Sequence, residues 1–297
     1  MLVFLNGRFV REEEAVVSVF DRSFLYGDGL FETMLVADGK PFRWMQHLER
    51  LGRGADFLKI KLPFSSAQLF EFAQNLIAEN KMPDALLRLT VSRGVGVRGY
   101  LPRGAENPTV VMSLHENPAA ALLKESESGA RQAVHPDASV FPKWKLTISS
   151  LRLPANEPLA QFKTCNKLPQ ILARAEADSA SADEALLLNT DGFVVEGASS
   201  NLFWIEHDSI CTPPLASGVL PGVTRAVVVE ICESLGMEIR ECNVSAELLK
   251  KMNGVFVSLS SWGIVEAESL DGCLLGRSPL TEKIRAAYWK CVRVETM

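Results

Sequence analysis

The stretch ALLLNTDGFVVEG (residues 185–197) carries two apolar runs, one on each side of an Asp-Gly pair. Such runs around Asp-Gly are typical of neighbouring strands joined by a tight turn, so we expect a turn at Asp191 and Gly192. Apolar residues with helical spacing precede this unit over residues 167–180. The alternation of helix and strands predicts an α/β fold with mixed sheets of the α+β type.

The same patterns predict secondary structure in the rest of the chain. Residues 224–235 (TRAVVVEICESL) have the spacing of a helix, with Thr224 as the expected cap and Gly236 just past the end. The run VFVSLS (255–260) predicts a strand that ends at a Ser-Ser-Trp-Gly turn. In the first half we expect two strands around the turn Asn6-Gly7, at 2–5 and 15–20. Two amphipathic helices are expected at 45–58 and 66–80, and a strand pair at 86–92 and 109–114.

A polar segment near the middle of the chain separates two halves. The segment ENPAAALLKESESGA (116–130) is rich in small and polar residues and ends near glycine, which is typical of a linker. A chain of 297 residues is long enough for two domains. We therefore expect a small N-terminal α/β domain at 1–115 and a large C-terminal α/β domain at 131–297, whose first stretch, 131–149, is strand-like.

Composition excludes several classes of partner. The chain has 31 Lys plus Arg against 36 Asp plus Glu, a net charge of −5, so no basic surface for a nucleic acid is expected. No segment reaches the roughly 20 apolar residues that a membrane span needs, and the start, MLVFLNGRFVREEE, lacks the pattern of a signal peptide. Six cysteines without a CxxC pair and four scattered histidines favour reduced thiols in a cytoplasmic protein and disfavour a metal site.

A glycine-rich loop follows the predicted strand at 86–92. Gly94, Gly96 and Gly99 match the spacing G-x-G-x-x-G of dinucleotide-binding proteins, but Pro102 and the next predicted strand leave no room for the crossover helix. We therefore expect a hairpin loop instead. Because glycines flank Arg98, the backbone can fold around a ligand that the guanidinium would hold, and a carboxylate is the natural ligand.

Three further features have both a structural and a catalytic interpretation. Lys163 precedes a helix, where a lysine is usually solvated, yet a lysine can also form a Schiff base with pyridoxal phosphate. That cofactor needs a carboxylate for its pyridine nitrogen, for which Glu196 is a candidate. It also needs an anion site for its phosphate, which the amides of Val223 and Thr224 at a helix start could supply.

Five ordered motifs carry a resemblance to a known family. They cover nearly the whole chain, and with them the chain resembles the class IV aminotransferases, the fold type IV pyridoxal phosphate enzymes. The motifs are DRSFLYGDGLFET (21–33), HLERL (47–51), KTCNKL (163–168), EGASSNLF (196–203) and LPGVTR (220–225).

The resemblance implies a two-domain fold type IV enzyme and a role for each matching residue. Lys163 would form the Schiff base with pyridoxal 5'-phosphate, and Glu196 would face the pyridine nitrogen. The cofactor would lie in the cleft between the domains, and a loop of the partner in a homodimer would complete each site. By the same resemblance Arg50, Val223 and Thr224 would bind the phosphate, together with Ser260 or its neighbour Ser261, and Ser199 would lie beside the ring.

Residues near the substrate differ among the branches of the family. Branched-chain aminotransferases typically carry a tyrosine five residues beyond the lysine, where this chain has Leu168. D-amino acid aminotransferases hold the substrate carboxylate with a Tyr and an Arg-x-His, and here Phe31 replaces the Tyr, Arg98 is kept and Tyr100 replaces the His. The segment RGVGVRGY resembles aminodeoxychorismate lyase, whereas the turn SSWGIVEAESLDG departs from that lyase.

Three functions follow from this pattern. The first is transfer of an amino group between a small amino acid or amine and a keto acid. The second is a 4-amino-4-deoxychorismate lyase that releases pyruvate and 4-aminobenzoate, and the residues around the cofactor serve both reactions. The third is a pyridoxal phosphate-binding subunit without catalysis, which the presence of both Lys163 and Glu196 disfavours because storage needs no electron sink.

Overall fold

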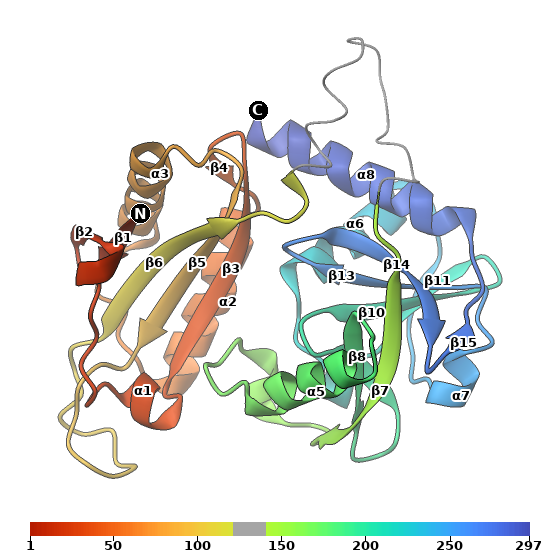
Figure 1. Cartoon of the computed structure of the whole chain (residues 1–297), viewed down its shortest axis with the longest axis horizontal. Coiled ribbons are helices and arrows are strands. Elements are labelled where there is room, and N and C mark those ends of the chain that lie inside the picture. Colours follow the sequence, from red (N-terminus) through yellow and green to blue (C-terminus); the bar gives the residue numbers. More distant parts are fainter. Residues whose placement is uncertain (121–140) are drawn as a thin grey trace. The chain divides into compact units, whose positions relative to one another are not determined.

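The computed structural model describes residues 1–120 and 141–297 of the chain (Figure 1). The chain forms two compact units. The first contains residues 1–120 and also two short later segments, 162–166 and 292–297. The described part of the second unit is 141–161 and 167–291.

The first unit is built on a six-stranded antiparallel sheet with the strand order β2-β1-β6-β5-β3-β4. Strand β3 pairs with β5 over its first eight residues, so that Thr33 lies opposite Arg88. The strands are β1 (Leu2–Leu5), β2 (Arg8–Arg11), β3 (Gly29–Ala37), β4 (Lys40–Pro41), β5 (Ala85–Ser92) and β6 (Thr109–Glu116).

Two long helices, α2 (Trp44–Leu58) and α3 (Ser66–Asn80), pack on one face of this sheet. Both confirm the predicted helices, and α3 begins at a capping box in which the Ser65 hydroxyl accepts a hydrogen bond from the amide of Gln68. Leu30, Met34 and other alternate residues of β3 join the helices in the core. Because side chains alternate along a strand, Phe31 and Thr33 lie on the opposite face.

The second unit is built on a nine-stranded mixed sheet whose longest path is β12-β11-β10-β13-β14-β7-β8-β9. Strand β9 also pairs with β10, so the strands β10, β13, β14, β7, β8 and β9 form a closed ring. The strands are β7 (Trp144–Leu153), β8 (Glu184–Asn189), β9 (Val194–Gly197), β10 (Asn201–Glu206), β11 (Ser209–Thr212), β12 (Ile239–Glu241), β13 (Gly254–Leu259), β14 (Gly263–Leu270) and β15 (Cys273–Leu274).

Within residues 141–297, four α-helices follow the start of the second sheet, the last of which ends in the first unit, and two of them confirm predictions. Helix α5 matches the expected helix at 167–180, and α6 ends just before Gly236, which has a positive φ of 66°. The expected cap was wrong, because Gly222 caps α6 and Thr224 lies inside its first turn. The helices are α5 (Leu168–Ser179), α6 (Val223–Ser234), α7 (Ala246–Leu249) and α8 (Pro279–Thr296), and α1 (Arg22–Tyr26) belongs to the first unit.

The N-terminal hairpin corrects one prediction. Asn6 and Gly7 both have positive φ, as a two-residue hairpin turn requires, so the second strand starts at Arg8 and pairs at once with β1. The strand expected at 15–20 is therefore wrong. The strand pairs expected at 86–92 with 109–114 and around Asp191-Gly192 are confirmed.

The linker expected at 116–130 and the strand-like stretch at 131–149 extend into residues 121–140, which lie outside the described part of the chain. Strand β6 reaches Glu116, and the described portion of the later stretch forms the beginning of β7. No helix in residues 1–120 or 141–297 is long and apolar enough to cross a membrane.

Candidate active site

Lys163 lies in a short segment, 162–166, that runs along the edge of β3 in the first unit. The amide of Phe31 donates a hydrogen bond of 2.9 Å to the carbonyl of Lys163, and the amide of Cys165 donates one of 2.9 Å to the carbonyl of Gly29. Leu30 and Thr164 form the bridge between them. The backbone of β3 therefore fixes the position of the lysine.

The ring of Phe31 contacts two cationic side chains. The amine nitrogen of Lys163 is 4.9 Å from the ring centroid, and the guanidinium carbon of Arg88 is 3.9 Å from it. Arg88 also interacts electrostatically with Cys165, and its partial burial lowers its pKa. The sequence analysis missed Arg88, although a single arginine within the apolar strand LLRLTVS was a signal for it.

On the helix face of β3, Glu32 holds both Arg50 and His47. Arg50 donates from Nε to Oε1 of Glu32 at 2.8 Å and from Nη2 to Oε2, while Nδ1 of His47 is 2.7 Å from Oε2. All three side chains are buried. Arg50, the predicted phosphate ligand, therefore has its charge balanced by a carboxylate of the same unit, and two of the five N–H groups of a guanidinium are used in this way.

The pKa values of Glu32 and His47 are both shifted in this buried group. Burial raises the pKa of Glu32, but the charge and hydrogen bonds of Arg50, together with His47, outweigh burial and lower the pKa to about 2. Burial also lowers the pKa of His47, and the charges of Arg50 and Lys163 act in the same direction against the opposing effect of Glu32. The charge of Lys163 thus acts on His47, which links this buried group to the candidate lysine.

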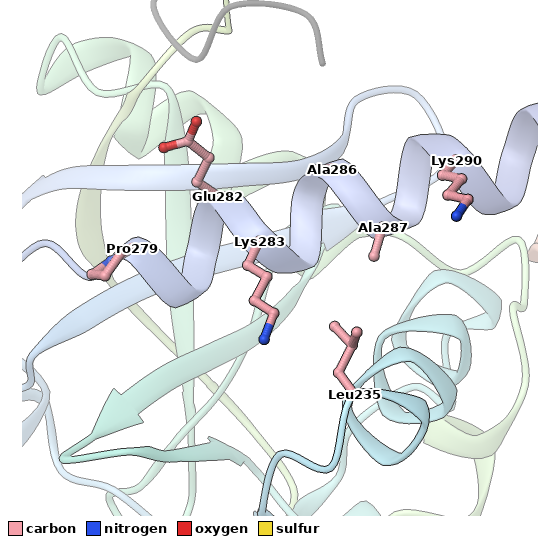
Figure 2. Close-up of a pocket in the computed structure, with 7 residues that line it drawn as sticks. All are labelled: Leu235, Pro279, Glu282, Lys283, Ala286, Ala287 and Lys290. Atoms are coloured by element: carbon pink, nitrogen blue, oxygen red, sulfur yellow. The ribbon is translucent and has the colours of Figure 1, made fainter. Parts of the chain in front are cut away.

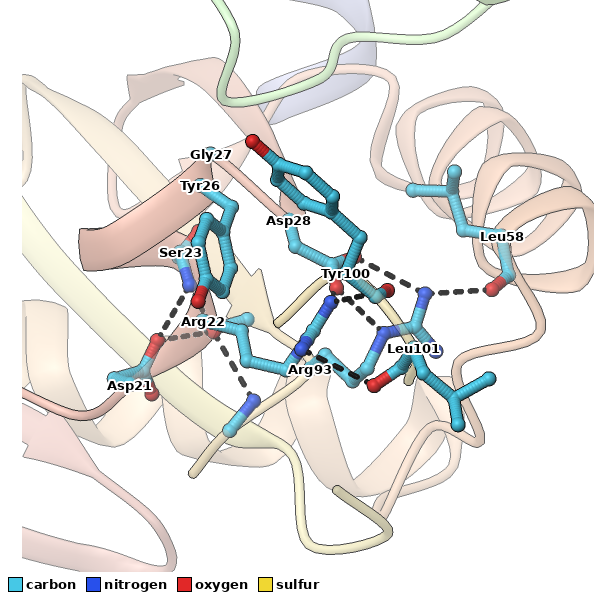
Figure 3. A network of polar contacts seen from close by, with 12 residues as sticks. Asp21, Arg22, Ser23, Tyr26, Gly27, Asp28, Leu58, Arg93, Tyr100 and Leu101 are labelled. Carbon is cyan, nitrogen blue, oxygen red and sulfur yellow. Dashed lines mark hydrogen bonds and ion pairs between the residues drawn. The ribbon is translucent and has the colours of Figure 1, made fainter. Parts of the chain in front are cut away.

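The two other predicted substrate residues lie on the loop between β5 and β6. Arg98 is exposed and Tyr100 is 87% exposed, with its ring edge against Tyr26 at a centroid distance of 5.6 Å. The backbone of this loop is held by Arg22, as Figure 3 shows. The side chains of Arg98 and Tyr100 are thus presented on the surface of a fixed loop.

In the second unit, Glu196 is connected to the segment before α6. Its side chain is buried, and Oε2 accepts a hydrogen bond of 3.0 Å from the amide of Leu220. Asn201 lies opposite Glu196 in the β9–β10 pair and donates from Nδ2 to the carbonyl of Leu220 at 2.9 Å. A carboxylate and an amide side chain therefore bind the N–H and the C=O of Leu220 and fix the segment before α6 to the strands.

The first turn of α6 has the features of an anion site. Gly222 provides no side-chain cap, so the amides of Val223 and Thr224 and the helix dipole are available to an acceptor. A Cβ atom on residue 222 would lie 1.9 Å from Oδ1 of Asn201, so only glycine permits this close approach. Val223 and Thr224 are themselves buried.

A buried hydroxyl on β13 lies on the same face as this turn. Ser258 pairs with Asn201 across the strands, so their side chains share a face. The Ser258 hydroxyl has no hydrogen-bond partner among the residues that the structure describes. Ser260 and Ser261, the two predicted phosphate ligands, follow directly in the turn after β13 and are half-buried.

Ser199 has a partner of its own. Its hydroxyl donates to Oε2 of the buried Glu184 at 2.6 Å, and its amide donates to the same oxygen at 3.2 Å. The hydroxyl of Ser200 also reaches this oxygen. Glu184 therefore shapes the turn after Glu196, a role that sequence patterns did not predict.

A surface pocket of the second unit is separate from these residues (Figure 2). It lies between the end of α6 and α8, with Leu235, Ala286 and Ala287 as apolar lining and Lys283 and Lys290 beside them. None of the predicted site residues lines it. Among residues 1–120 and 141–297, no three metal-ligating side chains lie together.

The first unit thus holds a lysine at a strand edge beside an aromatic ring, and the second unit holds a buried carboxylate and a helix start without a side-chain cap. The sequence model of the family described as amino-transferase class IV matches residues 29–270. The chain belongs to this family, whose enzymes depend on pyridoxal phosphate. The resemblance and the fold class are thereby confirmed.

Similar proteins come from several branches of the family. A "Putative branched-chain-amino-acid aminotransferase" of Methanocaldococcus jannaschii is 34% identical over 97% of this chain and 95% of its own. The aminodeoxychorismate lyase of Bacillus subtilis is 30% identical over 84% of this chain and 79% of its own. The D-alanine aminotransferase of Bacillus licheniformis is 29% identical over 100% of this chain and 99% of its own.

The fold agrees with these relatives. The crystal structure of the Escherichia coli branched-chain amino acid aminotransferase matches with a TM-score of 0.85 and 27% identity, over 97% of this chain and 93% of that chain. The relatives include both aminotransferases and a lyase.

Proposed function

We propose that the chain is a pyridoxal 5'-phosphate-dependent aminotransferase that moves an amino group between a small amino acid or amine and a keto acid. The observation that carries the proposal is the position of Lys163, which β3 fixes with its amine over the ring of Phe31. A lysine held in this way can form a Schiff base with the aldehyde of the cofactor. Membership of the family supports the same class of reaction.

The donors in the second unit fit the phosphate of this cofactor. The uncapped amides of Val223 and Thr224 and the buried hydroxyl of Ser258 are the groups that a phosphate prefers. We assign phosphate binding to these groups, with Ser260 or Ser261 as a further hydroxyl. Arg50 would add hydrogen bonds and little net charge, because Glu32 already balances it.

Glu196 and Ser199 have distinct roles toward the ring in this proposal. The buried carboxylate of Glu196, fixed by Leu220, would keep the pyridine nitrogen protonated. Ser199 would lie beside the ring, with its hydroxyl oriented by Glu184. When bound, the cofactor withdraws electrons from the carbon next to the substrate nitrogen. The amine of Lys163, once the substrate nitrogen has replaced it, would move protons as a general base and acid at Nζ.

The substrate would be recognised through positive charge. Arg98 and Tyr100 are exposed on their loop, and Arg98 would bind the substrate carboxylate. Arg88, over the other substrate candidate Phe31, adds a second cation near Lys163. Two cations favour an acid with two carboxylates as one of the substrates.

The exposed surface of the first unit supports a homodimer. Val19, Phe20, Phe24, Val97 and Leu101 are each more than half exposed, and large exposed apolar side chains on two segments of one unit favour an interface. We propose that a second copy of the chain covers them and that the loop with Arg98 completes the site of the partner. A cytoplasmic location remains a prediction from the cysteine pattern.

The 4-amino-4-deoxychorismate lyase is the second candidate. The 30% identity to the lyase of Bacillus subtilis and the loop RGVGVRGY favour it. It would use Lys163 and Glu196 in the same way and release pyruvate and 4-aminobenzoate. A subunit that binds the cofactor without catalysis is the third.

One pair of assays tests these alternatives. The purified protein with pyridoxal 5'-phosphate is incubated with single amino acids of either hand and 2-oxoglutarate, and separately with aminodeoxychorismate alone. New keto acid in the first assay supports the aminotransferase. Pyruvate in the second assay without activity in the first would contradict the aminotransferase and support the lyase. Activity in neither assay would support the non-catalytic subunit.

A further inference from the structure

The loop that carries Arg98 and Tyr100 turns its backbone toward one buried side chain. Nη1 of Arg22 donates to the carbonyl of Gly99 at 2.8 Å and to that of Leu101 at 3.4 Å, and Nη2 donates to the carbonyl of Tyr100 at 3.0 Å (Figure 3). Three consecutive carbonyl groups thus point at one guanidinium. The side chain of Tyr100 is 87% exposed, and its ring lies 5.6 Å from that of Tyr26.

Arg22 is itself held firmly. Its Nε donates to Oδ2 of Asp28 at 2.8 Å, and its guanidinium lies 5.0 Å from the ring centroid of Tyr26. Asp28 also accepts two hydrogen bonds from Arg93, of 2.7 and 3.0 Å, and Arg93 donates to the carbonyl groups of Leu58 and Lys59. Burial raises the pKa of Asp28, but the two arginines outweigh burial and lower it, so the carboxylate stays charged between them.

The loop has further contacts with this helix. The hydroxyl of Tyr26 accepts a hydrogen bond of 3.1 Å from the amide of Gly99. A Cβ atom on Gly96 would lie 3.2 Å from Cδ of Arg22, so the backbone packs directly on this side chain. A Cβ atom on Gly94 would lie 1.9 Å from the carbonyl oxygen of Asn107, which closes the base of the loop. Arg22 therefore lies beneath the whole tip of the loop.

We propose that Arg22 is a positioning residue for substrate recognition, which fixes the loop so that Arg98 and Tyr100 are ready to bind a substrate carboxylate. This inference rests on the proposed function. A loop ordered before binding loses less conformational entropy when the substrate binds, so the gain is in affinity. The same gain applies to the substrate and the transition state, and loss of Arg22 should therefore raise KM more than it lowers kcat.

The test compares two variants with one control. Arg22→Gln removes the hydrogen bonds to the three carbonyl groups. Tyr26→Phe removes only the acceptor for the amide of Gly99, and it tests the loop contacts if Arg22→Gln does not fold. Arg285→Gln is the control, because Arg285 is also a buried arginine but belongs to α8 in the second unit. The first readout is amide hydrogen exchange of residues 94–101, which needs neither cofactor nor activity.

The second readout uses the loaded enzyme with the amino acid that the wild type accepts best and with the amine that lacks its carboxylate. We expect Arg22→Gln to speed exchange in the loop about tenfold and to raise KM for the amino acid about tenfold, with the amine unchanged. When Arg22→Gln is combined with Arg98→Ala, KM for the amino acid should rise little above its value in Arg98→Ala alone, because both changes act through the same contact. Tyr26→Phe should change both readouts in the same direction by less.

Two results would overturn the proposal. One is a loop that exchanges no faster in Arg22→Gln or Tyr26→Phe than in Arg285→Gln. The other is an equal rise of KM for amino acid and amine, or full additivity with Arg98→Ala, either of which makes Arg22 merely structural. A wild type that converts no amino acid at all would instead overturn the proposed function, and with it the recognition role, even where loop exchange responds to Arg22.

Discussion

The amine of Lys163 lies 4.9 Å from the centre of the Phe31 ring, while the amide of Phe31 donates a hydrogen bond to the carbonyl of Lys163. The two residues are far apart in sequence, yet backbone and side chain both join them. A cation over an aromatic face is a favourable contact. The strand that carries Phe31 therefore determines where the lysine amine can act.

Replacing Lys163 by alanine should remove the Schiff base and the proton carrier together. Wild-type protein supplied with pyridoxal 5'-phosphate should be yellow, and Lys163→Ala should lose the Schiff-base absorption band and at least about 10²-fold in turnover. Lys167→Ala, four residues away, is the control that should keep both. A band of wild-type intensity in Lys163→Ala would refute the role of this lysine.

Arg88 should select for substrates with a second carboxylate. In Arg88→Gln the cation over Phe31 is lost, and we expect KM for 2-oxoglutarate to rise about tenfold while KM for pyruvate changes little. Arg11→Gln, on the exposed strand β2, is a matched control. Steady-state kinetics with both keto acids measure the effect, and a parallel rise for both would show that Arg88 acts on the reaction centre in general.

The parts of the fold that depend on local spacing could be predicted from the sequence. Helices α2 and α3 follow from apolar residues at helical spacing, and the turn at Asp191-Gly192 follows from its residue types. The second strand of the N-terminal hairpin was misplaced because the apolar run at 15–20 outweighed the short and mostly exposed β2. Exposure of that run is a property of the folded surface and not of its local pattern.

The interactions that join distant elements could not be predicted. Glu32 and Arg50 lie on a strand and a helix, and no local pattern shows that they pair. Glu184 and Ser199 meet only because β8 and β9 are neighbours. The hydrogen bond from Arg22 to the carbonyl of Gly99 likewise joins residues that only the fold brings together. The family motifs contained several of these residues, but gave no role for Glu32, Glu184 or Arg22.

Glu196 should be needed for turnover and not for retention of the cofactor. Glu196→Gln keeps the size of the side chain but cannot hold a charge opposite the pyridine nitrogen, so we expect turnover to fall by about 10²–10³. Equilibrium dialysis should still find the cofactor bound, because the phosphate donors are unchanged. Wild-type turnover in Glu196→Gln would remove this carboxylate from the site.

His47 should make the apo-protein less stable as the medium becomes acidic. Its pKa is lowered in the folded state from 6.5, so the unfolded chain binds more protons below pH 6.5 and stability falls there. Glu32, with its pKa lowered from 4.5 to about 2, adds a further loss of stability as the pH falls through that range. His47→Gln should reduce the slope of unfolding free energy between pH 6.5 and 5 by up to about 1.4 kcal/mol per pH unit. Urea titrations measure it, and identical slopes would show that His47 binds protons equally in the folded and the unfolded protein.

A mixture of two variants with impaired turnover should gain activity if the loop serves the partner's site. Lys163→Ala lacks the lysine and Arg98→Ala lacks the carboxylate ligand, so a mixed dimer contains one site with both residues, provided that the loop crosses to the partner. Random exchange of subunits makes half of the dimers mixed, with one complete site in two, which predicts about a quarter of the wild-type activity. Each variant alone, denatured and refolded in the same way, is the control. No gain on mixing, in samples shown by native mass spectrometry to contain mixed dimers, would mean that Arg98 acts within its own chain.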